Sequence, residues 1–578
     1  MAAPAYALAL TLAVTAPLLA PGYLLIRDAV STPRSYLSDS ALGLSEAAPR
    51  ALPQDYAVAL ASSVIDGGMV VKALLIAGLW LAGWGAARLT STVLPDAGIP
   101  GQCVAATVAI WNPYVGERLL QGHWSLLVGY GCLPWVAVSV LRLRGHLPRV
   151  RPAPETQCGG SAGATLRERY FGRDGLALLF WIALAGLTPT GLLLAAIIAL
   201  ACSLSRGAGR SRLFCTALSL AAATIAALPW LVASAVAGGW AAEVDDAGIP
   251  AFAARAEPGL GTLGSLASLG GIWNADAVPA SRTTVFALLS AGMLLTVVAL
   301  GVPILLRRRV AVPLLVVAAF AVVCPALMAT GTGLAVLEAA VRAVPGLGVL
   351  RDGQKWVALA VPGYALAGAA AVLTLRRWAP AAAAAAVCCA ALVATLPDLG
   401  WGVGGRVSPV RYPPGWSAAA AVINADPRPV AVLPVDSMRR FGWAGEAPVL
   451  DPLPRWVRAD VLSTGDLTVA GRTVRGEGTH AREVQRLLTT GADREQLAAA
   501  GVGWVVVEGP DPGLELPVAH RNPDITVYSV GGQTSGAPHR GLMLAAHAAW
   551  LGLLGFGLIG MLLEGRLRRP RRAARSID

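Results

Sequence analysis

The chain has 578 residues, of which 55% are apolar and 14% are charged, and its mean hydropathy is +0.61. This exceeds what one soluble core requires, so an ordinary soluble protein is excluded and a polytopic membrane protein is indicated. The net charge of +12 does not indicate a nucleic-acid-binding protein. The arginines form short clusters between apolar runs, instead of one basic face with interleaved aromatic residues.

Apolar runs long enough to cross a bilayer, which takes about 20 residues, recur along the whole chain. They are predicted at 5–25, 69–90, 97–113, 124–142, 213–237, 284–306, 310–329, 356–375, 380–397 and 541–563. The uncharged stretch 175–204 has basic flanks on both sides and contains LTPTG at 187–191, so it is predicted to form a hairpin of two short helices. The sequence thus predicts a polytopic α-helical membrane protein with about twelve transmembrane helices.

The basic clusters predict which side of the membrane each loop faces. Positively charged loops stay in the cytoplasm, which places 142–151, 205–212, 307–309, 376–377 and 566–575 there. The opposite side receives 26–68, 114–123, 238–283 with the acidic EVDD at 243–246, 330–355 and 398–540. A multi-pass plasma-membrane protein with both termini in the cytoplasm is therefore expected.

Residues 398–540 are too polar for the bilayer and long enough for a small domain. Short β-rich runs at 429–435 and 501–509 alternate with helical patterns at 480–490 and 493–501. We therefore predict an extracytoplasmic α/β domain at 398–540. It would lie between a transmembrane domain at 1–397 and a final helix with a basic tail at 541–578.

Residue types that bind metals or form disulfides are scattered. The eight cysteines and six histidines form no CxxC or HExxH motif, so no tightly bound metal is predicted, and a weakly bound divalent cation remains open.

Of the 46 basic residues, two are lysines, Lys72 and Lys355. Such a preference for arginine is typical of a GC-rich genome, such as that of an actinobacterium.

The first predicted outer loop carries acidic residues just beyond the membrane. Arg27 and Asp28 are followed by Asp39 and by an amphipathic stretch near 51–65, which is expected to lie along the membrane interface. A carboxylate here is a candidate general base for an attacking hydroxyl. In the alternative interpretation, Arg27 and Asp28 are an ion pair that ends the first helix.

The second candidate region is WNPYVGERLLQGHWSLLVGYGCLPW at 111–135, which contains a short outer turn between two spans. Its Asn112, Glu117, Arg118, His123 and Trp124 combine polar groups with an aromatic ring, which suits sugar binding. The alternative is that the aromatic residues anchor the chain at the membrane interface, where tryptophan and tyrosine are common.

The third candidate region is GLGVLRDGQKWVALA at 346–360. At the outer membrane face, Arg351 and Lys355 could hold a lipid-linked phosphate, with Asp352 orienting them and Lys72 of the second helix joining them. The alternative is snorkelling, in which the two basic side chains reach the lipid headgroups and bind no substrate.

These features together resemble the GT-C superfamily of integral membrane glycosyltransferases. The matching features are the acidic first outer loop with Asp28 and Asp39, the many spans, and the basic cluster of Arg351 and Lys355 in a later outer loop. More narrowly, GYLLIRDAV, WNPYVGERLLQGHW and LRDGQKW are similar to segments of actinobacterial membrane proteins that are related to polyprenyl-phosphate-dependent arabinofuranosyl- and mannosyltransferases. LAAAGVGWVVVEG is similar to the outer α/β domain of large membrane glycosyltransferases.

The resemblance implies inverting transfer from a polyprenyl-phosphate sugar donor to a cell-envelope glycan or glycolipid on the outer face. Asp28 would be the base or a metal-positioning carboxylate, and Arg351 and Lys355 would neutralise the departing lipid phosphate. The chain departs from the superfamily pattern in one respect. The usual paired acids are absent, because Ala29 follows Asp28 and the next acid is Asp39.

Two other functions remain open from the sequence. A transporter or flippase of lipid-linked sugars would use the same outer basic group, although transporters usually show internal repeats and the two halves of this chain are not similar. A non-catalytic scaffold for envelope assembly would use the 398–540 region to hold partners.

Overall fold

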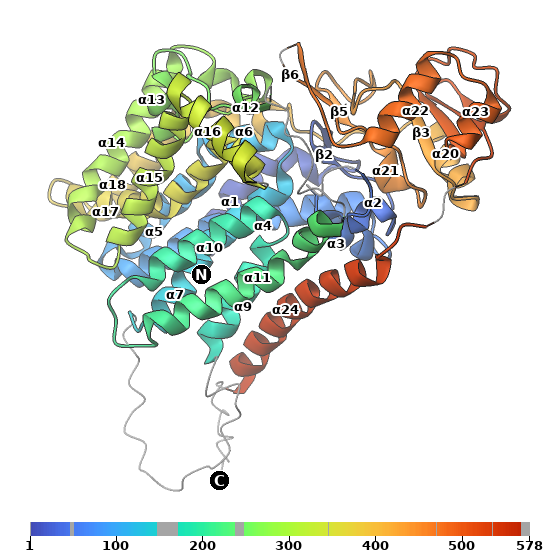
Figure 1. Ribbon diagram of the computed structural model, residues 1–578. Helices are drawn as coiled ribbons and strands as arrows, with labels where there is room; N and C mark the ends of the chain where they lie inside the picture. The colour runs from blue at the N-terminus through green and yellow to red at the C-terminus, as the bar shows by residue number, and fades with distance from the viewer. Residues whose placement is uncertain are drawn as a thin grey trace, which may run out of the picture.

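A computed structural model describes residues 2–46, 51–146, 172–236, 248–344, 346–469, 471–533 and 536–567. Figure 1 shows a large helical body with the strands gathered at one side of it. The acidic EVDD segment, residues 147–151 of the first predicted cytoplasmic loop and the tail after 567 lie outside the described residues.

The helical body is built from long apolar helices and shorter connecting ones. The long helices are α1 (Ala2–Thr15), α4 (Gly67–Val93), α5 (Gly98–Ile110), α7 (Trp124–Leu143), α9 (Gly172–Ala185), α10 (Pro189–Ser203), α11 (Arg212–Val236), α14 (Phe286–Leu306), α15 (Val312–Met328), α16 (Gly331–Ala343), α17 (Val361–Leu375), α18 (Ala381–Ala394) and α24 (Arg540–Leu567). The short ones are α2 (Asp39–Leu42), α3 (Gln54–Ala61), α6 (Pro113–Gln121), α12 (Gly248–Ala251), α13 (Gly261–Ala267), α19 (Gly400–Gly404) and the 3-10 helices η1 (Ala16–Leu19), η2 (Pro95–Ala97), η3 (Ala275–Ala277), η4 (Ala280–Arg282), η5 (Leu347–Leu350), η6 (Gly353–Ala360) and η7 (Pro397–Leu399).

In the part of the chain that the structure describes, seven helices are long and apolar enough to cross a membrane. The number rises to nine if the bent pair of α15 and α16 (94°) and the pair of α18 and 397–404 (74°) each count as one span. The protein is thus polytopic, but twelve full-length spans are not confirmed. Helices α5, α9 and α10 have 13, 14 and 15 residues, because Pro, Gly and capping residues end a helix where the apolar run continues.

The predicted hairpin at 175–204 takes the form of α9 and α10. Thr188 begins α10, and its hydroxyl accepts a hydrogen bond from the N–H of Gly191 at 3.0 Å. This cap lies within LTPTG and turns the chain between two helices that are each too short to span a bilayer of ordinary thickness upright.

Helix α7 and the segment Gly353–Leu375 form the interior of the bundle. In the apolar stretches of these two segments 89% and 83% of the residues are buried, compared with 33% in Ala2–Leu19 and in helix α11. Small residues allow this close packing. A Cβ atom at Gly131 of α7 would lie 2.1 Å from the carbonyl oxygen of Gly78 of α4, so glycine is required at this crossing. Helix α24 packs along α9 and α11 (Figure 1).

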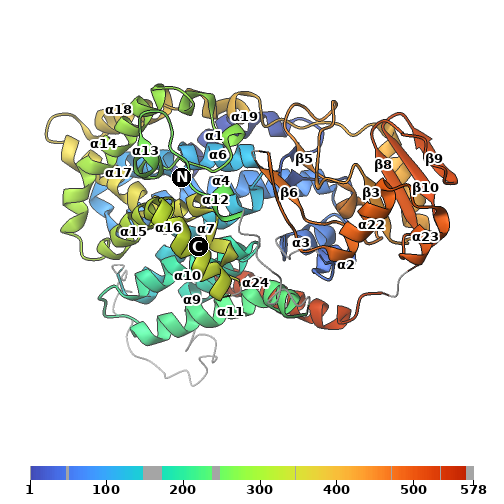
Figure 2. The ribbon, with the colours of Figure 1, turned by 45° about the horizontal axis from the view of Figure 1, so that its top comes forward.

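The strand-rich region contains a four-stranded sheet of order β3-β8-β10-β9 (Figure 2). Its strands are β3 (Val430–Leu433), β8 (Trp504–Glu508), β9 (Val518–Asn522) and β10 (Ile525–Ser529). Strands β3 and β8 are parallel, with Val430 opposite Trp504, and the other pairs are antiparallel. The two strands expected from the sequence at 429–435 and 501–509 are these parallel neighbours.

Helices cover both faces of this sheet. Alternate residues of a strand point to opposite faces, so Val430 and Val432 pack against α20 (Pro414–Ala425), and Ala431 packs against α22 (Thr479–Thr489) and α23 (Arg494–Ala499). The remaining elements are α21 (Leu453–Trp456) and the pairs β4 (Met438–Arg439) with β5 (Val449–Leu450) and β6 (Leu467–Val469) with β7 (Arg472–Val474). The position of the strand-rich region outside the cytoplasm stays a prediction.

A small hairpin from the first predicted outer loop joins the helical body to the strand-rich region. It consists of β1 (Leu25–Ile26) and β2 (Ala29–Val30). Leu25 and Val30 are buried in the same apolar cluster as Trp416 of α20. The hairpin turn is therefore fixed by a region more than 380 residues later in the chain, as the hydrogen bond from Tyr412 Oη to the carbonyl oxygen of Ser31 shows (3.0 Å, 381 residues apart).

Candidate active site

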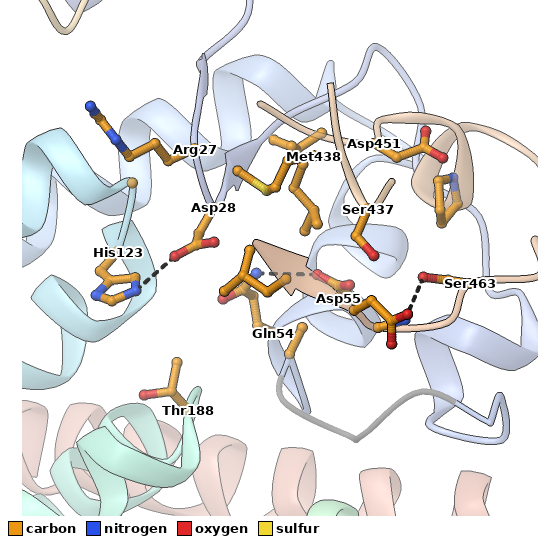
Figure 3. Close-up of a pocket in the computed structure, with 18 of the residues that line it drawn as sticks. Arg27, Asp28, Gln54, Asp55, His123, Thr188, Ser437, Met438, Asp451 and Ser463 are labelled. Atoms are coloured by element: carbon orange, nitrogen blue, oxygen red, sulfur yellow. Dashed lines mark hydrogen bonds and ion pairs between the residues drawn. The ribbon is translucent and has the colours of Figure 1, made fainter. Parts of the chain in front are cut away.

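A cavity of about 1500 Å³ lies between the helical body and the strand-rich region (Figure 3). The helical body contributes the ends of α6, α7 and α10 together with η5 and η6, and the strand-rich region contributes 436–440 and 460–469. Six residues predicted from the sequence as catalytic or substrate-binding line it: Arg27, Asp28, His123, Trp124, Arg351 and Lys355.

The turn of the β1–β2 hairpin carries Asp28 into this cavity. Arg27, the residue before it, has a φ of 47°, in the left-handed region that non-glycine residues seldom occupy. Backbone hydrogen bonds hold it there, since its N–H donates to the carbonyl oxygen of Pro448 (2.8 Å) and its own carbonyl accepts from Leu450 (2.9 Å). Such strain persists where the surroundings over-determine it, which is common at functional sites.

The side chain of Arg27 supports the turn instead of reaching into the cavity. It is 4% exposed. Its Nη1 donates to the carbonyl oxygen of Leu120 (2.6 Å) and its Nη2 donates to that of Asp276 (2.8 Å). These contacts indicate that Arg27 holds the hairpin against the end of α6.

Two side chains from the end of α6 and the start of α7 hold the carboxylate of Asp28. Gln121 Nε2 donates to Asp28 Oδ2 at 3.0 Å, and His123 Nε2 lies 2.9 Å from the same oxygen (Figure 3). Within the described chain both contacts reach Oδ2 and none reaches Oδ1, and the side chain is 42% exposed. The contacts to Oδ2 thus fix the orientation of the Asp28 carboxylate, while Oδ1 is available to a ligand.

The surroundings of Asp28 keep it ionised. Burial raises the pKa of this carboxyl, but the hydrogen bonds from His123 and Gln121 and the charge of Lys355 outweigh burial and lower it below the ordinary value. An ionised carboxylate with a free oxygen is what a general base requires.

Arg351 and Lys355 lie on the wall of the same cavity, in the segment of η5 and η6. Asp352 begins η6, and its Oδ1 accepts a hydrogen bond from the N–H of Lys355 (3.3 Å). Lys355 Nζ lies 3.8 Å from Asp352 Oδ2, and Arg351 Nε donates to the carbonyl oxygen of Gly348 (3.1 Å). Two cations and the candidate base therefore share one cavity.

Asp352 is itself held by a buried arginine of α6. Arg118 Nη1 and Nη2 lie 2.8 and 3.1 Å from the two carboxylate oxygens of Asp352, a bidentate ion pair. Although burial raises the pKa of Asp352, the charges of Arg118 and Lys355 lower it to about 2. The predicted orienting role of Asp352 therefore has a structural basis.

Four residues predicted as site residues do not line the cavity. Asp39 pairs with Arg540 at the start of α24 through Oδ1 and Nη1, so it anchors that helix. Lys72 is buried, and its Nζ donates to the carbonyl oxygen of Ala20 at 2.9 Å. These contacts do not support the predicted catalytic role of Asp39 or the predicted phosphate contact of Lys72.

The other two are Asn112 and Glu117, which are buried in the fold. Asn112 caps α6, where its Oδ1 accepts from the N–H of Val115 at 3.1 Å. Glu117 accepts from the backbone N–H of Gly271 (3.0 Å) and from Gln354 Nε2 (2.8 Å). Both side chains thus make contacts within the fold and do not line the cavity, which does not support the substrate contacts predicted for them.

Several cavity residues were not predicted from the sequence. They include Gln54, Asp55, Gln121, Thr188, Asp436, Ser437, Asp451 and Ser463. They are common polar residues from segments far apart in the chain, and no local spacing marks them. Gln121 is the exception, since it stands two residues before His123 in a turn that was already a candidate.

Aromatic residues also line the cavity. They include Tyr36, Trp124, Trp230, Trp273, Trp356 and Phe252. Sugar rings and apolar chains both pack against such faces. As for metals, no group of three or more His, Cys, Asp or Glu suited to hold an ion occurs in the described ranges.

Among known structures, the fold is similar to that of an arabinofuranosyltransferase. This protein is AftD from Mycobacteria, and its cryo-EM structure superposes on the chain with a TM-score of 0.57 at 16% sequence identity. The match covers 93% of this chain and 40% of that one, so the chain spans about two fifths of the length of AftD. A mutant of AftD matches with a TM-score of 0.49 at 16% identity, over 93% of this chain and 42% of that one.

The sequence matches no protein-family model and no curated protein. The structural match to AftD nevertheless confirms the predicted resemblance to GT-C glycosyltransferases at the level of the fold.

Proposed function

We propose that the protein is a membrane glycosyltransferase that moves a sugar from a polyprenyl-phosphate donor to a cell-envelope glycan or glycolipid on the outer face. The observation that carries the proposal is that an ionised carboxylate, Asp28, and two cations, Arg351 and Lys355, line one cavity. The fold it shares with an arabinofuranosyltransferase supports the same class of reaction.

The proposed reaction is a single inverting displacement. A hydroxyl oxygen of the acceptor forms a bond to the anomeric carbon, and its proton passes to the free carboxylate oxygen of Asp28. The bond between the anomeric carbon and the phosphate oxygen breaks, and the lipid phosphate leaves with the electron pair. Arg351 and Lys355 stabilise the charge that develops on that phosphate.

The apolar part of the cavity suits the lipid tail of such a donor. Leu193 of α10, Leu231 of α11 and Leu347 of η5 line it together with Trp230 and Trp356. Burial of prenyl carbons against these side chains contributes about 0.8 kcal/mol per CH₂ group. The cationic residues of η5 and η6 would then meet the phosphate where the lipid tail ends.

The test is transfer of a labelled sugar from a polyprenyl-phosphate donor by purified protein in detergent micelles. Asp28→Asn keeps the shape of the side chain but removes the base, so transfer should fall roughly 100- to 10,000-fold. Asp39→Asn is the matched control, because this acid lies in the same loop but outside the cavity, and it should keep transfer activity. Wild-type rates from Asp28→Asn would remove Asp28 from the mechanism.

The same experiment separates an enzyme from a transporter. Micelles have no sealed compartment, so label that appears on an acceptor glycan has been transferred chemically. Binding of the donor with no transfer to any acceptor would favour a transporter of lipid-linked sugars.

A further inference from the structure

Arg118 of α6 lies one layer behind the cavity wall and is fully buried. Besides its ion pair with Asp352, its Nη1 lies 3.0 Å from Nδ1 of His123. Its Nη2 also donates to Gln354 Oε1. On one side, Arg118 thus contacts His123, which lies next to the candidate base Asp28. On the other side, it contacts Asp352, which lies next to Lys355. Arg351 and Lys355 together are called the candidate phosphate clamp.

The contact with Arg118 determines where the proton of His123 lies. A guanidinium group has N–H donors and no acceptor, so Nδ1 of His123 must accept and carries no proton. The proton of the neutral ring then lies on Nε2, which is 2.9 Å from Asp28 Oδ2. Nε2–H therefore donates to Asp28, and the carboxylate acts as the acceptor in this pair.

We propose that Arg118 is a positioning residue that holds His123 in its neutral Nε2–H tautomer and thereby keeps Asp28 unprotonated and correctly oriented. This inference rests on the proposed function, because it takes Asp28 as the base. It extends that function by assigning a role to two residues, Arg118 and His123, that need not touch the reacting atoms.

The charges around His123 agree with a neutral ring. Arg118 faces it from α6, Asp28 from the hairpin turn, and Lys355 and Asp352 from η6. Burial, with the positive charges of Arg118 and Lys355, outweighs the attraction of Asp28 and lowers the pKa of His123. Without Arg118, Nδ1 is free to bind a proton, and the imidazolium would make Asp28 a weaker base.

The other side of Arg118 holds the start of η6. Asp352, its ion-pair partner, caps η6 and lies 3.8 Å from Nζ of Lys355. Through Asp352, the guanidinium of Arg118 thus fixes the position of Lys355 relative to Asp28. Because a bidentate ion pair such as Arg118–Asp352 is geometrically specific, Arg118 fixes the candidate base and the clamp relative to each other.

The first test measures the tautomer directly. In protein labelled with ¹⁵N-histidine in micelles, nitrogen chemical shifts distinguish protonated from unprotonated ring nitrogens, and His123→Gln assigns the signal among the six histidines. We expect an unprotonated Nδ1 and a protonated Nε2 between about pH 6 and 8. A protonated Nδ1 in this range would overturn the proposal, whether or not the protein transfers sugar.

The second test removes both charges of the buried pair together, as Arg118→Gln with Asp352→Asn, because a lone buried charge is poorly tolerated. His123 should then titrate near neutral pH, and transfer should acquire an acid limb that falls about tenfold per pH unit. Adding His123→Gln should remove this limb, since the amide donates to Asp28 without titrating.

Arg118→Lys is the second variant and keeps the positive charge at this position. One ammonium cannot reproduce the fork that serves both His123 and Asp352, so His123 should again become titratable. If the rate of transfer does not depend on pH and the tautomer of His123 is unchanged in both variants, Arg118 serves as a structural partner of Asp352 and does not position His123. Absence of transfer by the wild-type protein would instead contradict the proposed function, while the tautomer remains measurable.

Discussion

The charged residues of the site divide by depth. Asp28 and Lys355 reach the cavity, with side chains 42% and 26% exposed, whereas Arg118 and Asp352 behind them are 0% and 7% exposed. The pKa of Asp352 is lowered to about 2, so its contribution to stability is present above the ordinary carboxyl pKa and is lost as the pH falls toward 2. At working pH the buried pair is therefore a fixed support for the exposed charges.

At this scale we predict the behaviour of the clamp. Arg351→Gln and Lys355→Gln each remove a charge-assisted contact to phosphate worth about 1.5–3 kcal/mol, so binding of a labelled polyprenyl-phosphate sugar in micelles should weaken roughly ten- to a hundredfold. Arg342→Gln is the control, because Arg342 pairs with Glu338 on α16 outside the cavity. Unchanged affinity of the two clamp variants would mean that Arg351 and Lys355 snorkel.

Among the elements, the β1–β2 hairpin and the end of α6 act as one unit. Gly122 stands between the two residues that contact Asp28, and it has a φ of +82°. A Cβ atom there would lie 2.3 Å from the backbone nitrogen of Ala29 and 2.4 Å from the carbonyl oxygen of Ile26. Glycine is required because the hairpin backbone lies directly against this position.

Gly122→Ala should therefore displace the hairpin and separate Asp28 from Gln121 and His123. A shift of about 1 Å at a reacting group can cost roughly a hundredfold in rate, and we expect a loss of that order in sugar transfer. Gly491→Ala shares the left-handed backbone (φ +74°) but meets nothing within 4 Å, so it controls for backbone strain alone. Equal activity of the two variants would show that the hairpin contact does not position Asp28.

Across the whole molecule, the cavity exists because the strand-rich region docks on the helical body. Asp55 of α3 and Arg455 of α21 form an ion pair across this boundary, with Arg455 Nη2 3.2 Å from Asp55 Oδ2. The buried residues Leu25 and Val30 of the hairpin extend the core of the strand-rich region. If the strand-rich region lies outside the cytoplasm, as predicted, the site lies there as well.

Membrane topology can be tested in whole cells with a maleimide that does not cross membranes. Thr489→Cys, at the exposed end of α22, should be labelled in intact cells, and Arg309→Cys, between α14 and α15, should be labelled after permeabilisation alone. The unsubstituted chain is the background control, since its described cysteines are buried or partly buried. The opposite labelling pattern would place the site in the cytoplasm.

Much of the arrangement could be predicted from local sequence. Apolar runs identified the long helices, and the Pro and Gly of LTPTG identified the turn between α9 and α10. Asp28, His123 and Lys355 could be selected because polar groups are costly at a membrane edge and tend to be functional or paired. The same rule also selected Asp39 and Glu117, which are paired with other parts of the protein.

The sequence by itself determined that the protein is a polytopic membrane protein, where most of its long helices lie and which charged residues are candidates, because these depend on composition and on neighbours along the chain. Which of those residues share a cavity was decided by the tertiary structure. Arg118 and Asp352 pair across 234 residues, and Asp28 and His123 meet across 95. No spacing in the sequence encodes such contacts, since they form when packed helices and the docked strand-rich region bring distant segments together.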